Sequence, residues 1–446
     1  MKHFKFDQSD CNITSHSGLS LIGSALHHHT HLIEQLDESI PLRHGMKHSD
    51  IIKSYLGLIS LGKSDFEAIE SMANDDFYLA ALNLESIPTA DRLRQRMDHR
   101  AIDYLPAVVQ APIDFLESTQ ATVTPLPMGH VALDADVTPF DNSGSKKEGV
   151  SFTYKKYDGY APMAAYLGQE GYCIEFELRE GKQHCQKNTP ELLKRAFTRA
   201  CRLTDRPILL RLDSGNDALA NIDAVLDYNN AHPQADIDFI IKWNPRQKDH
   251  DYWLELAEKE AQWDEPRPGK RVGLFDVTVT RNWKGYEYRL RRVMRIVERT
   301  IDKHGQHLAI PEVEVEGWWT SLWSETQEII DLYCDHGTSE QFHSEFKTDM
   351  DIERLPSGKF ATNELVLACS VLVYNILRWI GQNGLRRPDA PIRHKAKRRR
   401  IKTVMQELMY LAAKFTKTGR RLKITFGKFC RVRGIFERLY HRLSYG

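Results

Sequence analysis

VALDADVTPF, residues 131–140, is the stretch of this sequence that decides the fold. Its run of apolar residues predicts a buried β-strand. Asp134 and Asp136 interrupt that run at alternate positions. Side chains two residues apart on a strand point to the same face of a sheet, so both carboxylates are expected on one face. The stretch therefore predicts a core strand that carries acidic side chains near its carboxyl end.

The residues after this strand predict an α/β domain. Apolar and β-branched runs predict further strands, and an amphipathic pattern at 190–203 and a segment from about 218 to 227 predict helices. The resulting order is three strands, a helix, a strand, a helix and a strand, which is typical of a mixed sheet, antiparallel at first and then parallel. The expected strands are VALDADVTPF (131–140), GVSFTYKK (149–156), YCIEFELREG (172–181), RPILLRLD (206–213) and DIDFIIKWN (236–244).

The remaining segments divide the chain into three expected regions. Residues 1–125 predict a helical, DNA-binding N-terminal region with a basic helix, and residues 126–382 the α/β domain. Within that domain, residues 246–325 are rich in β-branched and aromatic side chains and predict an inserted β-rich subdomain. Residues 383–446 predict a basic helical tail.

Charge is distributed unevenly along the 446 residues, although the formal net charge is zero. From Arg378 to the end there are 20 Lys and Arg against 3 acidic residues. Such an excess of positive charge indicates a polyanionic partner, and Arg398, Arg399 and Arg400 are its densest run. Seven scattered cysteines without a CxxC pair, and an N-terminus without an apolar signal segment, favour a reducing, cytoplasmic location. The most apolar run, 365–380, contains Asn375 and Arg378, so no membrane span is expected.

Two further acids complete a candidate catalytic set. Asp213 ends a predicted strand, and Glu340 lies in the helical run Tyr333–Lys347 with the spacing Y-x2-H-x3-E-x6-K. Carboxylates at strand ends project into the crevice where α/β domains bind ligands. Three carboxylates can hold two divalent cations for phosphoryl transfer. Periodicity alone does not choose between Asp134 and Asp136 for the first acid, nor between Glu340 and Glu345 for the third.

Taken together, these motifs resemble the DDE transposases of bacterial insertion sequences, in the branch whose third acid lies in a Y-x2-R-x3-E-x6-K signature. The matches include Asp134, Asp136 and Thr138 in DxDxT, GYxPM at 159–163, RLDSG at 211–215, and Tyr333, Glu340 and Lys347 in the signature. The resemblance implies a ribonuclease-H-like catalytic domain with a β-rich insertion. It selects Asp136, two residues before Thr138, and Glu340, seven residues before Lys347. The signature arginine is replaced by His336, whose charge depends on pH.

The resemblance implies an enzyme that cleaves transposon ends and joins their 3′-hydroxyls to target DNA. Asp136, Asp213 and Glu340 would hold two Mg²⁺ ions, for which Mn²⁺ substitutes, and Tyr333, His336 and Lys347 would contact DNA. The expected partners are terminal inverted repeats, target DNA and a second copy of the chain, in the bacterial cytoplasm near the nucleoid and without a membrane. Two alternatives remain, namely another ribonuclease-H-like nuclease and a catalytically inactive DNA-binding descendant.

Two side-chain clusters lie outside this set. The histidines at 27, 28, 29 and 31 lack a cysteine or acid at ligand spacing, so a zinc site is not expected there. Trp318, Trp319 and Trp323 are expected in the core, and stacking on a DNA base is the alternative role.

Overall fold

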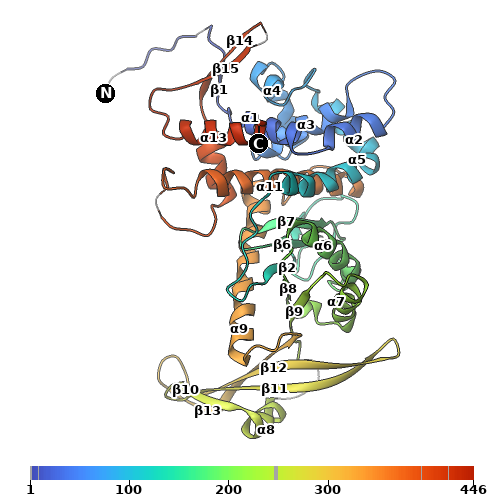
Figure 1. Ribbon diagram of the computed structural model, residues 1–446, viewed down its shortest axis with the longest axis vertical. Coiled ribbons are helices and arrows are strands. Elements are labelled where there is room, and N and C mark those ends of the chain that lie inside the picture. Colours follow the sequence, from blue (N-terminus) through green and yellow to red (C-terminus); the bar gives the residue numbers. More distant parts are fainter. Residues whose placement is uncertain (1–2, 9, 246–249, 393, 420, 446) are drawn as a thin grey trace.

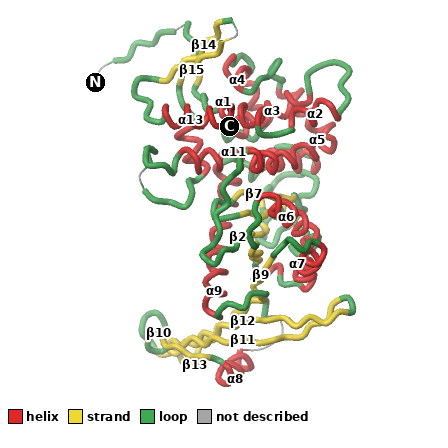
Figure 2. The backbone as a smooth tube through the Cα atoms, viewed as in Figure 1, coloured by secondary structure: helices red, strands yellow, loops and turns green. Residues whose placement is uncertain are grey.

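The computed structural model describes residues 3–8, 10–245, 250–392, 394–419 and 421–445. The molecule is elongated (Figure 1). A helical body forms one end, a mixed sheet lies in the middle, and long antiparallel strands form the other end. Figure 2 shows that strands occur mainly in the middle and at the far end, with one hairpin beside the helical body.

Five strands of a nine-stranded sheet form the middle of the molecule, in the order β7-β6-β2-β8-β9. β2 pairs antiparallel with β6, and β6 pairs antiparallel with β7. β8 is parallel to β2, and β9 is parallel to β8. The predicted mixed α/β fold, antiparallel first and parallel afterwards, is therefore observed. The strands are β2 (Val131–Val137), β6 (Met163–Leu167), β7 (Tyr172–Glu177), β8 (Ile208–Leu212) and β9 (Ile237–Lys242).

The prediction of a core strand at 149–156 is wrong. Only β4 (Ser151–Phe152) forms there, in a small sheet of order β3-β5-β4 with β3 (Phe140–Asp141) and β5 (Asp158–Tyr160). The strand that pairs antiparallel with β2 is instead β6, whose five residues are all buried. A strand buried on both faces has no polar alternation, so its sequence lacks the period-two pattern that marks half-buried strands.

The β-rich stretch continues the same sheet beyond β9. β13 pairs antiparallel with β9, and the order then runs outward through β12 and β11 to β10. Cross-strand pairs such as Arg295–Glu316 and Arg299–Glu314 connect β12 with β13. Residues 246–249 of the predicted insertion lie outside the described residues. The elements are α8 (His250–Glu260), β10 (Gln262–Arg267), β11 (Lys270–Trp283), β12 (Tyr286–Ile301) and β13 (His307–Thr320).

Helices cover both faces of the central sheet. The amphipathic α6 (Thr189–Leu203) packs on β7, and α7 (Leu219–Ala231) packs beside β9. On the opposite face lies a helical run that begins at α9 and packs on β2 through α10. This run consists of α9 (Thr326–Cys334), η3 (Asp335–Thr338), α10 (Ser339–Ser344) and the π-helical η4 (Glu345–Asp349).

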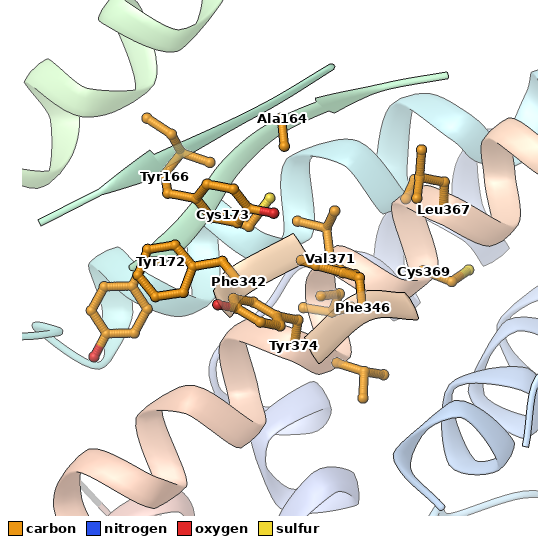
Figure 3. Packing of buried hydrophobic residues seen from close by; sticks show 14 of the residues in the cluster. Ala164, Tyr166, Tyr172, Cys173, Phe342, Phe346, Leu367, Cys369, Val371 and Tyr374 are labelled. Atoms are coloured by element: carbon orange, nitrogen blue, oxygen red, sulfur yellow. The ribbon is translucent and has the colours of Figure 1, made fainter. Parts of the chain in front are cut away.

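α11 (Phe360–Gly384) joins the sheet to the helical body. It is long and apolar enough to cross a membrane, yet 83% of its most apolar window is buried inside the protein. Figure 3 shows Phe342 and Phe346 between the strands and α11. Phe342 lies 4.9 Å from Tyr166, and Phe346 stacks on Tyr374 at 4.4 Å between ring centroids. A helix that is apolar on every side is stable here because helices and strands surround it.

The two ends of the chain build one helical body. α13 (Arg433–Tyr445) packs on α1, and β1 pairs with β14 of a C-terminal hairpin. The prediction of a wholly helical tail is wrong at 413–426, where β14 (Ala413–Thr418) and β15 (Arg421–Phe426) form that hairpin. The other elements are β1 (Ile13–Thr14), α1 (Leu19–His28), α2 (Leu32–Ser39), α3 (His48–Ser60), η1 (Phe66–Met72), α4 (Asp76–Ala81), α5 (Ala90–Ser118), η2 (Ser214–Asn216), α12 (Ile401–Val404) and η5 (Met405–Met409).

Candidate active site

The register of two parallel strands places acidic residues next to each other. Asp134 of β2 lies opposite Arg211 of β8, and Ala135 lies opposite Leu212. One residue further, Asp136 and Asp213 follow at the carboxyl ends of these strands. Asp213 keeps an extended backbone, with φ −73° and ψ 174°, before the η2 turn begins. Neighbouring strands of a sheet lie about 4.8 Å apart, so the two carboxylates share one edge.

Asp134 is neutralised by a buried ion pair. Arg211 donates to its two oxygens at 2.6 and 2.8 Å, and His336 Nδ1 lies 3.0 Å from Oδ1. Burial alone would raise the pKa of this carboxyl, but Arg211 and His336 outweigh it and lower the pKa to about 2. Arg211 also donates to the Leu332 carbonyl at 2.6 Å, which fixes α9 to the sheet. Asp134 therefore has a structural role, which leaves Asp136 as the acid of β2 that is available to bind a ligand.

Asp136 and Asp213 lack such a basic partner at hydrogen-bonding distance within the described chain. Asp136 Oδ1 accepts from the Val137 amide at 2.7 Å, and Asp213 Oδ1 accepts from the Asn216 side chain at 2.8 Å. Burial, and then the negative charge of Asp136, raise the pKa of Asp213. Two adjacent carboxylates that repel each other in this way provide oxygen ligands suited to a hard divalent cation. The donor set therefore fits a magnesium-type ion.

The third acid is less closely associated with the pair. Glu340 lies in the first turn of α10 and is exposed, and none of the described residues forms an ion pair with it. The described residues contain no group of three or more His, Cys, Asp or Glu side chains placed to hold a metal ion. Glu340 thus stays a predicted ligand on the helix that faces the two aspartates.

Glu345, the alternative third acid, is buried completely. It forms an ion pair with Arg378 and accepts hydrogen bonds from Tyr374 Oη and the Ile401 amide, both at 3.3 Å. These partners come from α11 and from the start of α12. Glu345 therefore connects three helical segments in the interior.

The remaining residues of the signature surround the acids. Tyr333 packs 5.7 Å from the His336 ring, and burial, then Asp213 and Asp136, raise its pKa. Lys347 lies 5.8 Å from the Phe140 ring. Burial lowers the pKa of Lys347; Glu353 opposes this effect, Lys155 adds to it, and Asp136 opposes it least. Tyr333, His336 and Lys347 are thus within electrostatic range of the acid pair.

The arginine run at 398–400 is held by the protein itself. Arg398 stacks on Phe342 at 4.4 Å and donates to Gln341 Oε1 at 3.1 Å. Arg399 is only 6% exposed and donates to the Leu385 and Ile392 carbonyls. Arg400 pairs with Asp349 at 2.8 Å. A buried guanidinium is not accessible to a phosphate group in solvent, so the DNA contact expected of Arg399 stays a prediction that this burial does not favour. Arg398 and Arg400 fix this segment to α10 and η4.

Two side chains near the acids, one tyrosine and one histidine, were not predicted from the sequence. Tyr154 is 61% exposed and donates to the Val137 carbonyl at 3.3 Å. Burial of its hydroxyl, then Asp136 and Asp213, raise the pKa of Tyr154. His343 Nε2 lies 3.6 Å from Asp136 Oδ2. Neither residue belongs to a spaced motif, so only the three-dimensional contact identifies them.

The other sequence clusters have mostly structural positions. Trp318 and Trp319 are 1% and 2% exposed, as expected for core residues, whereas Trp323 is 92% exposed. His29 bonds to Ser118 at 2.8 Å. His27 and His28 line a cavity of about 420 Å³ between α1 and the C-terminal hairpin.

Comparisons with known proteins place the chain in a class. The family model described as transposase DDE domain group 1 matches residues 2–445. The chain therefore belongs to the DDE transposases of this group. No curated protein matches it. Among solved structures, it is similar to a piggyBac transposase synaptic complex with hairpin DNA, at 11% identity and a TM-score of 0.43, covering 90% of this chain and 82% of that one.

Proposed function

We propose that this chain is a DNA-cutting and strand-joining enzyme whose catalytic acids are Asp136, Asp213 and Glu340. The observation that carries the proposal is the pair of carboxylates at the ends of β2 and β8, which have no arginine partner among the described residues, unlike Asp134 and Glu345. The strand order β7-β6-β2-β8-β9 supports a ribonuclease-H-like catalytic domain. The family supports transposition as the overall reaction.

Divalent cations, Mg²⁺ or Mn²⁺, are the proposed cofactors. When bound, such ions lower the pKa of a water or 3′-hydroxyl nucleophile and stabilise the leaving oxygen of the phosphodiester. The chain's own contribution is to hold the carboxylates in place. The Val137 amide and Asn216 fix one oxygen of Asp136 and one of Asp213, respectively. Glu340 would approach from α10 when DNA is bound.

We propose that Tyr333 and Lys347 contact the DNA strand that is cut, as the resemblance of the signature implies; Tyr333 packs beside His336, which contacts Asp134 of β2. Further DNA contact is proposed for a basic hollow of about 840 Å³ in the loop that follows α11. Its exposed cations form no ion pair with any acid in the described chain, so they are available to phosphates. They are Arg386, Arg387, Lys395 and Lys397.

The proposed reaction implies assembly with DNA. Two transposon ends must be cut and joined, so we propose at least two copies of the chain in the active complex. Terminal inverted repeats and target DNA are the proposed partners, in the cytoplasm of a bacterium that carries the element.

The test of the acid set is Asp213→Asn. The variant is expected to bind DNA that carries the element's ends with wild-type affinity and to cut none of it in Mg²⁺. Asp205→Asn, an exposed aspartate just before β8, is the matched control and should cut normally. Normal cleavage by the Asp213 variant would refute the proposed site.

An inactive DNA-binding protein is the second candidate. It is favoured by the exposed position of Glu340 and by His336 in place of the arginine of the signature. In that case the wild-type chain binds end-containing DNA but does not cut it in Mg²⁺ or Mn²⁺.

A further inference from the structure

His343 is a buried histidine that the proposed reaction does not use. It lies on α10, three residues after Glu340, and is 6% exposed. Its Nε2 atom lies 3.6 Å from Asp136 Oδ2, and its Nδ1 atom lies 3.1 Å from the Tyr166 hydroxyl. Tyr166 belongs to β6, the strand that pairs with β2, and is 1% exposed. The three side chains form a line from the interior to the first catalytic acid.

The position of the imidazole hydrogen follows from the tyrosine. Within the described chain, His343 is the one hydrogen-bond partner of the Tyr166 hydroxyl. A buried hydroxyl that fails to donate loses about 1–3 kcal/mol, so Tyr166 donates to Nδ1. A neutral imidazole that accepts at one nitrogen carries its hydrogen on the other. The Nε2–H group of His343 therefore points toward the carboxylate of Asp136.

Asp136 is consequently held from two sides. Its Oδ1 atom accepts from the Val137 amide at 2.7 Å, and its Oδ2 atom faces the Nε2–H group of His343. The backbone contact at Oδ1 alone leaves the carboxylate some freedom to turn about its Cβ–Cγ bond. The imidazole beside Oδ2 limits that rotation.

We propose that His343 is a positioning residue that orients Asp136: Tyr166 donates to His343 Nδ1, and the Nε2–H group of His343 makes a polar contact with Asp136 Oδ2 at 3.6 Å. This inference rests on the proposed function, because it assigns a purpose to the orientation of Asp136. These contacts also couple α10, which carries Glu340, to the strand that carries Asp136. Mutation of a side chain that orients a metal ligand typically changes metal affinity by about 10–100-fold.

Direct coordination by His343 is the competing role. It requires the opposite tautomer, with hydrogen on Nδ1 and a lone pair on Nε2. The Tyr166 hydroxyl would then accept instead of donate, and its hydrogen would be left without an acceptor in the interior. The hydrogen-bond pattern therefore favours a donor next to Asp136 over a ligand.

Mn²⁺ binding to the purified full-length chain, followed by electron paramagnetic resonance, tests the proposal independently of DNA cleavage. Replacing His343 with leucine, which removes the donor, should weaken Mn²⁺ binding about tenfold. Replacing it with glutamine, which retains an N–H donor, should keep affinity within about threefold of wild type. Histidine-selective ¹⁵N spectra of the metal-free protein should show the Nε2–H tautomer for the resonance that His343→Gln removes, and Tyr166→Phe should abolish that preference.

Three results would overturn the inference. The first is wild-type Mn²⁺ affinity in His343→Leu with an unchanged melting temperature. The second is an Nδ1–H tautomer, and the third is a ¹⁴N coupling to Mn²⁺ in the wild-type protein that His343→Gln eliminates. If His343→Leu does not fold, the Mn²⁺ affinity of the glutamine variant and the tautomer of His343 still test the inference. Asp136→Asn distinguishes failure of this inference from failure of the proposed function, because Mn²⁺ binding that survives this change refutes the proposed metal site itself.

Discussion

Glu340 and Glu345 are five residues apart, and a pair of matched variants should separate a catalytic acid from a structural one. Glu345 is fully buried and is paired with Arg378, whose side chain is 1% exposed. Glu345→Gln keeps the size of the side chain and an oxygen acceptor, but it leaves the guanidinium charge of Arg378 without its counter-ion. Glu340→Gln makes the same chemical change at an exposed position.

The expected loss in free energy of unfolding follows from how deeply each glutamate is buried. Breaking a buried ion pair by neutralising one partner costs about 3–5 kcal/mol, because the remaining charge cannot reach water. Arg378 retains hydrogen bonds to the Arg399 carbonyl at 2.7 Å and to Tyr374 Oη at 2.8 Å, so the lower end, about 3 kcal/mol, is expected for Glu345→Gln. Exposed substitutions usually change stability by less than about 0.5 kcal/mol, which is the expectation for Glu340→Gln.

The assays are urea unfolding followed by circular dichroism, and Mg²⁺-dependent cutting of end-containing DNA. Glu345→Gln should lower the free energy of unfolding and, at a temperature where it is folded, still cut DNA. Glu340→Gln should unfold like the wild type and cut nothing. A Glu345→Gln protein of wild-type stability without cleavage activity would refute this reasoning and make Glu345 the third acid.

Three further predictions follow from the charges around the site. In EDTA, Asp213→Asn should melt at a higher temperature than the wild type, because burial and Asp136 disfavour the charged carboxylate. Added Mg²⁺ should raise the melting temperature of the wild type but not that of the variant. A variant that Mg²⁺ stabilises more than the wild type would contradict a metal site shared by the two aspartates. Burial lowers the pKa of His336, but Asp134 outweighs it and raises the pKa above the usual 6.5. The stability that this pair contributes is therefore complete below pH 6.5 and is lost as pH rises through the folded-state value. Urea unfolding at pH 6 and pH 9 should show that loss in the wild type and a smaller one in His336→Gln; equal losses would exclude His336 as its source. Finally, Lys395→Ala should reduce the slope of log DNA affinity against log salt concentration by about 1. The exposed control Arg206→Ala should leave that slope unchanged. An unaltered slope in Lys395→Ala would show that the basic hollow does not contact DNA.

The core strands were predictable to different degrees. VALDADV and ILLRL are short apolar runs with an aspartate at or just beyond the carboxyl end, so both strands could be inferred, although each is shorter than the expected range. MAAYL was missed because a central strand buried on both faces has no alternation of polar and apolar residues. The C-terminal hairpin was missed because its strands, AKFTKT and RLKITF, are rich in lysine and arginine, which an exposed helix also contains.

The choice between neighbouring acids needed the structure. Alternation along β2 assigns Asp134 and Asp136 to the same face of the sheet, so it does not show which of them is the available acid. The strand register then pairs Asp134 with Arg211, which gives Asp134 a counter-ion that Asp136 does not share. In the same way, the spacing on the helical run leaves both Glu340 and Glu345 open, and the buried contact with Arg378 identifies Glu345 as structural.

By itself, the sequence determined the class of the protein, the α/β order of the chain and the short list of acids, because these depend on local patterns and on residue spacing. Only the tertiary structure decided which acids are paired with arginine, which arginines are buried, and that His343 and Tyr166 lie next to Asp136. Those properties depend on contacts between residues as far apart as 134 and 336, or 166 and 343. Such contacts are made when helices pack on the sheet, and no local pattern in the chain records them.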